Sequence, residues 1–310
     1  MRRIFLVLLA CFVPMQAQEE EGAAKKATLA NINAVVVFTS KDGLNSGYYD
    51  FTRANTTMAV LHLYDRYQFG TFSPHFNVFL AGGVGYSRTW MTNELPPATP
   101  AAATDTGLTL SNMLQTYTGE LGGGVRYVDD TGIEWSAGFN VIYSRVRFTN
   151  FNKTHIGEII GNFFDGNYND NLTYRFYLLS EYVWHAEGFV PYIKLSYNLY
   201  ETKSGFSVHE LKAFTSQSGV LSLMLGTESP PLVRSGSEYL TLEGYLWGSW
   251  LGGDLSRVAG FDGYGTLGAT AYWYMPKRWP FIRRFFADVS TIRADGLRGY
   301  NLGFGFSVAY

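Results

Sequence analysis

The chain has 310 residues, of which 16% are charged and 17% aromatic, with 34 glycines and a formal net charge of −2. This many aromatic residues argue against disorder, and no basic stripe is present that would point to a nucleic-acid partner. A sequence rich in aromatics and glycine and poor in charge suits β structure whose two faces meet different surroundings.

Residues 1–17 have the features of a cleaved export signal. Arg2 and Arg3 supply positive charge, a short apolar core follows, and Ala17 ends a cleavage site. The core is too short to span a bilayer as a helix, which needs about 20 residues. The sole cysteine, Cys11, resembles the acylated cysteine of a bacterial lipoprotein box, and the sequence leaves its lipidation open.

From residue 31 onward, apolar and polar residues alternate with a period of two. Ile133, Trp135 and Phe139 share one face, and Glu134 and Ser136 share the other. This period marks strands with one apolar and one polar face. Many segments reach the 9–11 residues with which a tilted strand crosses a membrane. Twelve strands are expected, at 31–39, 55–68, 75–88, 114–128, 131–148, 171–185, 188–201, 218–227, 238–250, 262–275, 284–294 and 297–310.

The connections between these strands alternate in length. The long ones are expected at 40–54, 89–113, 149–170 and 202–217. Outer-membrane barrels show this asymmetry, with short periplasmic turns and long extracellular loops. An even number of strands places both termini in the periplasm. The basic run at 276–284 is expected to be a solvated turn, with contact to anionic lipid headgroups as its alternative.

The last expected strand is the most regular. Its apolar residues are Tyr300, Leu302, Phe304, Phe306, Val308 and Tyr310. An Asp295-Gly296 hairpin turn before it sets Val289 opposite Leu302. Because an open sheet edge leaves backbone groups unsatisfied in hydrocarbon, the strand is expected to pair with the first one. The segment resembles the outer-membrane insertion signal, which implies recognition by the barrel-insertion machinery.

Charged residues on the polar faces are expected to line the lumen. A register centred on Asp130 sets Arg126 opposite Glu134 on the polar face and Val125 opposite Trp135 on the apolar one. The full lumen-facing charged set expected from the alternation is Glu120, Arg126, Glu134, Arg175, Glu181, Lys194 and Glu243. Both signs occur, which suits paired charges in a narrow wet interior.

Twelve strands and an aromatic C-terminus resemble the translocator barrels of autotransporters. Barely a dozen residues separate the signal from the first expected strand, so no passenger domain is expected there. The chain therefore resembles the solitary autotransporter-like β-barrels, which implies a transmembrane antiparallel β-barrel over 31–310. In autotransporters a helix often lies inside the barrel. Residues 18–30 are expected to form such a helix or a loose periplasmic tail.

Catalytic, cofactor and metal sites are not expected. Outer-membrane phospholipases carry a Ser two residues after a His, and none of the five histidines has that neighbour. His155 with Asp165 or Asp170 is the loosest arrangement for a protease-like loop site, and GDLS at 253–256 lacks the strand–turn–helix setting of a lipase motif.

The expected function is that of a non-enzymatic barrel in the outer membrane, acting as a narrow pore or as a structural or surface protein. The alternative is a barrel hydrolase of lipid, lipopolysaccharide or peptide, with a site in the extracellular loops. A weaker third reading is a translocator whose passenger is encoded separately. The expected partners are outer-membrane lipids and the insertion machinery. The sequence leaves open the oligomeric state and whether the lumen is open or plugged.

Overall fold

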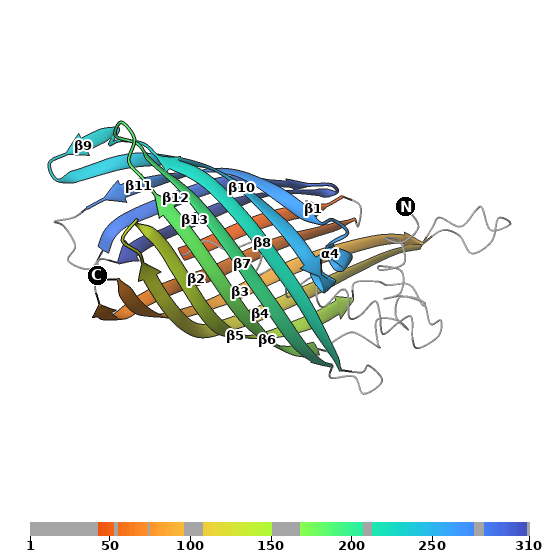
Figure 1. Cartoon of the computed structure of the whole chain (residues 1–310). Helices are drawn as coiled ribbons and strands as arrows, with labels where there is room; N and C mark the ends of the chain where they lie inside the picture. Colours follow the sequence, from red (N-terminus) through yellow and green to blue (C-terminus); the bar gives the residue numbers. More distant parts are fainter. Residues whose placement is uncertain are drawn as a thin grey trace.

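The computed structural model describes residues 43–52, 55–73, 75–95, 108–150, 168–206, 213–275 and 282–308, which form one antiparallel sheet closed on itself (Figure 1). Its long strands are β1 (Gly43–Phe51), β2 (Thr56–Ser73), β3 (Phe76–Leu95), β4 (Leu108–Val128), β5 (Ile133–Asn150), β6 (Tyr168–Val183), β7 (Val190–Phe206), β8 (Phe214–Glu228), β10 (Glu238–Gly253), β11 (Gly263–Tyr274), β12 (Ile282–Ala294) and β13 (Leu297–Val308). The expected all-β barrel of about 12 strands is confirmed.

Two short elements complete the described part. Strand β9 (Val233–Ser235) pairs only with β10, and helix α4 (Asp254–Ala259) lies between β10 and β11. No helix within the described ranges is long and apolar enough to cross a membrane.

The barrel closes where β1 meets β13. Leu44 pairs with Phe304, and Phe51 pairs with Leu297. Strand β10 likewise pairs with β8 on one side and with β11 on the other. Closure gives the backbone N–H and C=O groups of every long strand a partner, which hydrocarbon cannot supply. The regularity of the last strand is explained by its place between β12 and β1.

Alternation along the strands separates an outer wall from an inner wall. Phe139, Phe176 and Leu199 are neighbours across β5, β6 and β7, and each is 38–51% exposed. Asn140, which follows Phe139 on β5, and Thr173, three residues before Phe176 on β6, point inward and are buried. Large apolar side chains on the outside and polar ones on the inside are the reverse of a water-soluble sheet and suit a barrel set in lipid.

The first strand of the described barrel lies in a segment that was expected to be a loop. Residues 40–54 were expected to be a long loop, but they contain β1, which pairs with both β2 and β13. The expected strand at 31–39, like the segments 1–17 and 18–30, lies outside the described residues. Strand β1 escapes a pattern search because Ser46 and Asp50 interrupt its outer face and Gly47 its inner face.

The two turns used to set the register differ in outcome. Val289 pairs with Leu302 as expected across the Asp295-Gly296 turn. Across the β4–β5 turn the expected register is wrong by two residues, because Tyr127, not Val125, pairs with Trp135. Gly132 has a φ of 85°, which extends the turn by one residue beyond the expected 129–131. A shift of two preserves the faces, since side chains alternate with a period of two.

The strands are also longer than expected toward the end of the barrel at which β3, β5 and β7 finish. Strand β7 continues to Phe206 instead of ending at residue 201. Its outward residues change there from Leu199 to Glu201 and Lys203, so the apolar alternation stops while backbone pairing with β8 continues. At 15–21 residues, β2 to β8 exceed what a bilayer requires.

Candidate functional site: the lumen

The inner wall encloses a cavity of about 450 Å³, here called the lumen chamber. Side chains of β2, β6, β7, β8, β10, β11 and β12 line it. Its charged lining residues are Arg66, Arg175, Lys194, Arg284, Glu181, Glu228 and Glu243. Tyrosines fill much of the remaining wall, among them Tyr64, Tyr192 and Tyr272. The chamber therefore presents both signs of charge between polar aromatic surfaces.

The most buried ion pair joins β4 to β6 across the intervening strand. Arg175 Nη1 lies 3.1 Å from Glu120 Oε1, and the two side chains are only 16% and 2% exposed. Arg175 Nε donates to Asn198 Oδ1 at 3.0 Å, and the Asn140 amide donates to Glu120. The guanidinium also lies 5.1 Å from the centre of the Tyr177 ring. Contacts on several sides hold this pair in one geometry.

Two further ion pairs are more exposed. Lys194 Nζ lies 3.1 Å from Glu181 Oε2, directly across β6 and β7. Arg126 Nη2 bonds Glu134 Oε2 diagonally across β4 and β5. The structure thus brings six of the seven expected lumen charges together as three opposite-sign pairs.

The seventh residue, Glu243, is bonded by tyrosines. The hydroxyl groups of Tyr192 and Tyr272 both donate to its carboxylate, which is 7% exposed. The Arg284 guanidinium lies 4.1 Å from the centre of the Tyr272 ring. A cation therefore stacks on one of the two tyrosines that bond Glu243. Two hydroxyl donors stabilise a carboxylate that burial would otherwise disfavour.

Sequence reasoning missed a second charged group beside Glu243. Arg284 ends the basic run that was expected to be a solvated turn and also begins the strand expected at 284–294; the structure places it on β12, where it donates to Tyr274 Oη at 2.6 Å. Its Nη1 is also 3.7 Å from Glu228. Asp288, four residues after Arg284 on β12, accepts a hydrogen bond from Thr270 Oγ1 at 2.7 Å. Val289 faces outward, so extending that parity along β12 would have placed both residues in the lumen.

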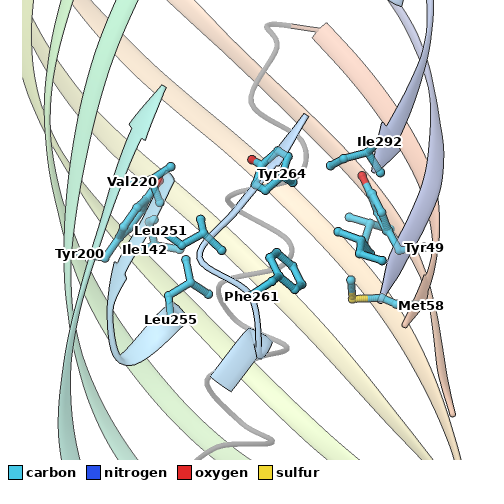
Figure 2. Close-up of a cluster of buried hydrophobic side chains, with 12 residues drawn as sticks. Tyr49, Met58, Ile142, Tyr200, Val220, Leu251, Leu255, Phe261, Tyr264 and Ile292 are labelled. Carbon is cyan, nitrogen blue, oxygen red and sulfur yellow. The ribbon is translucent and has the colours of Figure 1, made fainter. Parts of the chain in front are cut away.

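An apolar cluster crosses the lumen next to the chamber and shares Tyr200, Val220 and Tyr264 with its wall. Its members come from opposite sides of the barrel and are 0–8% exposed (Figure 2). Figure 2 shows Tyr200, Val220 and Leu251 on one side and Met58 and Ile292 on the other. The full cluster is Tyr49, Met58, Val60, Ile142, Tyr200, Val220, Leu251, Leu255, Phe261, Tyr264, Ile292 and Leu297. Inward apolar residues at this level give the lumen an apolar section next to its charged one.

Helix α4 contributes to the cluster through Leu255. The chain turns into the helix at Gly253, whose φ is 72° and where an added Cβ would lie 2.4 Å from the Gln217 carbonyl oxygen. Asp254 accepts from the Gln217 backbone N–H at 3.2 Å, and Leu255 N donates to Ser218 Oγ at 3.1 Å. The GDLS residues thus anchor α4 to the end of β8.

Four residues of the expected C-terminal insertion signal lie on the outer wall. Tyr300, Leu302, Phe304 and Phe306 are 42–55% exposed, Val308 ends β13, and Tyr310 lies outside the described residues. Asp170, part of the loose protease-like candidate, also lies on the outer wall, where it accepts from Arg145 and Tyr143; His155 and Asp165 lie outside the described residues. Among the described residues, no group of His, Cys, Asp and Glu is arranged to hold a metal ion.

Solved structures with the same fold are translocator barrels of autotransporters. The β domain of the Bordetella autotransporter BrkA matches with a TM-score of 0.57 and 13% identity, covering 85% of this chain and 96% of that one. The translocator domain of NalP from Neisseria meningitidis matches with a TM-score of 0.55 and 12% identity, covering 94% and 98%. The transport unit of AIDA-I from Escherichia coli matches with a TM-score of 0.55 and 8% identity, covering 94% and 99%.

These matches define the class of fold: an outer-membrane type of antiparallel β-barrel with 12 long strands. The expected resemblance to autotransporter translocator barrels is confirmed at the level of architecture. No protein-family model matches the chain, and no curated relative matches it.

Proposed function

We propose that this chain is an integral outer-membrane protein that acts, without catalysing a reaction, as a narrow pore. The observation that supports it most is the lumen itself, in which the charged chamber adjoins the apolar cluster around Phe261 and Leu255. Paired charges keep the chamber wet. An apolar section of a pore limits ion passage by excluding water.

In this proposal both chain ends face the periplasm. Strand β13 ends at the same end of the barrel as the short β2–β3 and β4–β5 turns, which are the periplasmic kind in barrels of this type. Strands β3 and β5 finish at the opposite end, at Leu95 and Asn150, and in this proposal that end faces the medium.

Single-channel conductance in a planar bilayer tests the pore. The mature protein is expected to pass a small, steady current. The double variant Leu255→Ser, Phe261→Ser is expected to raise that current several-fold, because it makes the apolar section polar. Leu232→Ser, at a side chain that is 54% exposed outside the lumen, serves as the control and leaves the current unchanged.

Deletion of residues 18–30 is measured in the same bilayer. A larger current in the deleted protein places that segment in the lumen, whereas an unchanged current places it outside. The pore would be contradicted if no current passed through the mature protein, the deletion variant or the Leu255→Ser, Phe261→Ser variant.

A further inference from the structure

The outer wall carries an apolar groove over β8, β10, β11 and β12. Its volume is about 490 Å³, within the 300–1,000 Å³ of ordinary small-molecule sites. The floor is formed by Gly248 and Gly265, which lie directly opposite each other. An added Cβ at Gly265 would meet no atom within 4 Å, so the missing side chains leave open space. Leu246, Leu267 and Trp250 form the walls and are 53–59% exposed.

A pair of arginines lies at one side of this groove. The sheet register continues the floor from Gly265 to Arg293 and then to Arg298. Arg293 itself lines the groove. The two arginines face each other directly across β12 and β13, an arrangement that costs stability for like charges.

No ion pair joins either guanidinium to a carboxylate of the described residues. Asp50 lies directly opposite Arg298 across β13 and β1, but the two side chains do not form an ion pair. Arg145, on the opposite side of the barrel, differs in this respect, since Asp170 bonds it at 2.7 Å and 3.0 Å. The Arg293–Arg298 pair therefore remains available to an external anion.

The height of the pair on the barrel matches that of lipid headgroups. One step along β13 and β1, Tyr300 and Tyr48 stack with ring centres 5.7 Å apart on the outer wall. Aromatic residues of this kind occupy the boundary between hydrocarbon and water. Arginines just beyond that boundary meet phosphates, whose oxygens match the fork of the guanidinium group.

We propose that this groove is a specific lipid site, in which an acyl chain lies over Gly248 and Gly265 and the lipid phosphate is bound by Arg293 and Arg298. The Asp295-Gly296 turn beside the arginines lies at the same end of the barrel as Leu95 and Asn150, where β3 and β5 finish. In the proposed orientation the lipid is the phosphorylated glycolipid of the outer leaflet, lipid A. The site lies outside the lumen, so it does not depend on whether the barrel conducts.

Native mass spectrometry of the refolded mature protein in detergent micelles tests the site, with purified lipid A as the probe and phosphatidylglycerol and phosphatidylcholine as competitors. The Arg293→Gln, Arg298→Gln double variant is expected to lower the apparent affinity for lipid A roughly tenfold, since each charge-assisted contact to phosphate is strong. Gly265→Leu is expected to lower it similarly by filling the groove.

Two matched controls separate the site from general effects. Arg283→Gln removes an exposed cation from the other end of β12, and Gly119→Leu adds a side chain to open space on β4. Both are expected to change the affinity less than twofold. The site is refuted if the double arginine variant binds lipid A as the unaltered protein does, or if either control weakens binding as much. Equal binding of phosphatidylcholine, whose choline cation balances its phosphate, would refute recognition of an anionic headgroup by the arginines, and tighter binding of phosphatidylglycerol would remove lipid A as the occupant.

Discussion

Two ion pairs of the lumen differ in burial and therefore in what they contribute to stability. Glu120 and Arg175 are 2% and 16% exposed, whereas Arg126 and Glu134 are 39% and 21% exposed. A buried charge whose partner is removed pays its full desolvation cost, but a charge in contact with water is solvated again. Loss of the arginine is therefore expected to cost more stability at the Glu120–Arg175 pair than at the Arg126–Glu134 pair.

Arg175→Met is expected to destabilise the folded barrel by about 3 kcal/mol, since it leaves Glu120 buried without its cation. Adding Glu120→Gln to that variant is expected to restore most of the loss. The free energy of unfolding in guanidinium chloride, measured in lipid vesicles, checks both. Arg126→Met is the control, with an expected loss below about 1 kcal/mol. Equal losses from Arg175→Met and Arg126→Met would contradict the role assigned to burial.

At the scale of the element, the β4–β5 turn shows how one side chain sets the register of a hairpin. Asp129 Oδ1 accepts from Thr131 Oγ1 at 2.6 Å and from the backbone N–H groups of Thr131 and Ile133, each at 2.9 Å. These bonds, with the left-handed φ of Gly132, define the turn that joins the two strands.

The Thr131 hydroxyl, with the backbone N–H of Ile133, holds the pKa of the Asp129 carboxyl below its usual range. Its contribution to stability is therefore complete above about pH 4, where the unfolded carboxyl is ionised, and is lost as the pH falls through the lower folded value. Asp129→Asn is expected to show a smaller loss of stability between pH 7 and pH 2 than the unaltered protein.

Denaturant midpoints at the two pH values measure this difference. Asp130→Asn is the neighbouring control, because the Asp130 side chain is 96% exposed and its ion-pair contact, with His75 Nε2, is long at 3.6 Å. If Asp129→Asn and the unaltered protein lost the same stability on acidification, the ionised carboxylate would have no role in the turn.

How far the sequence predicts each element depends on whether the alternation is visible in it. Strand β13 is predicted fully, because large apolar residues such as Phe304 and Leu302 alternate with small ones. Strand β1 is not, because glycine and polar residues occupy both its faces. Arg284 was left out of the expected lumen set because it ends the basic run 276–284, whereas the alternation along β12 places it inward. The Arg175–Glu120 pair could not be foreseen, since it joins strands that are not adjacent.

For the molecule as a whole, the outer wall and the lumen are two surfaces with opposite solvents, separated by one residue along any strand. Leu195 is 47% exposed on the outer wall of β7, and Ser196 follows it on the wall of the lumen chamber. A probe that reaches water but not lipid distinguishes the two surfaces.

In lipid vesicles, Leu195→Cys is expected to resist a water-soluble maleimide, while Ser196→Cys reacts with it. In the unfolded protein both are expected to react at equal rates, which supplies the control for intrinsic reactivity. The measured quantity is the fraction labelled over time. Rapid labelling of Leu195→Cys in the folded protein would contradict a lipid-facing outer wall.

The apolar cluster also has a consequence for the order in which the molecule folds. Tyr49 and Met58 come from the first two described strands, while Ile292 and Leu297 come from the last two. Contacts between parts so distant in the chain form only after the entropy of closing the intervening loop has been overcome. The cluster is therefore completed late, when β1 meets β13. Its packing then acts mainly on the rate of unfolding, so it keeps a closed barrel closed without helping the first strands to assemble.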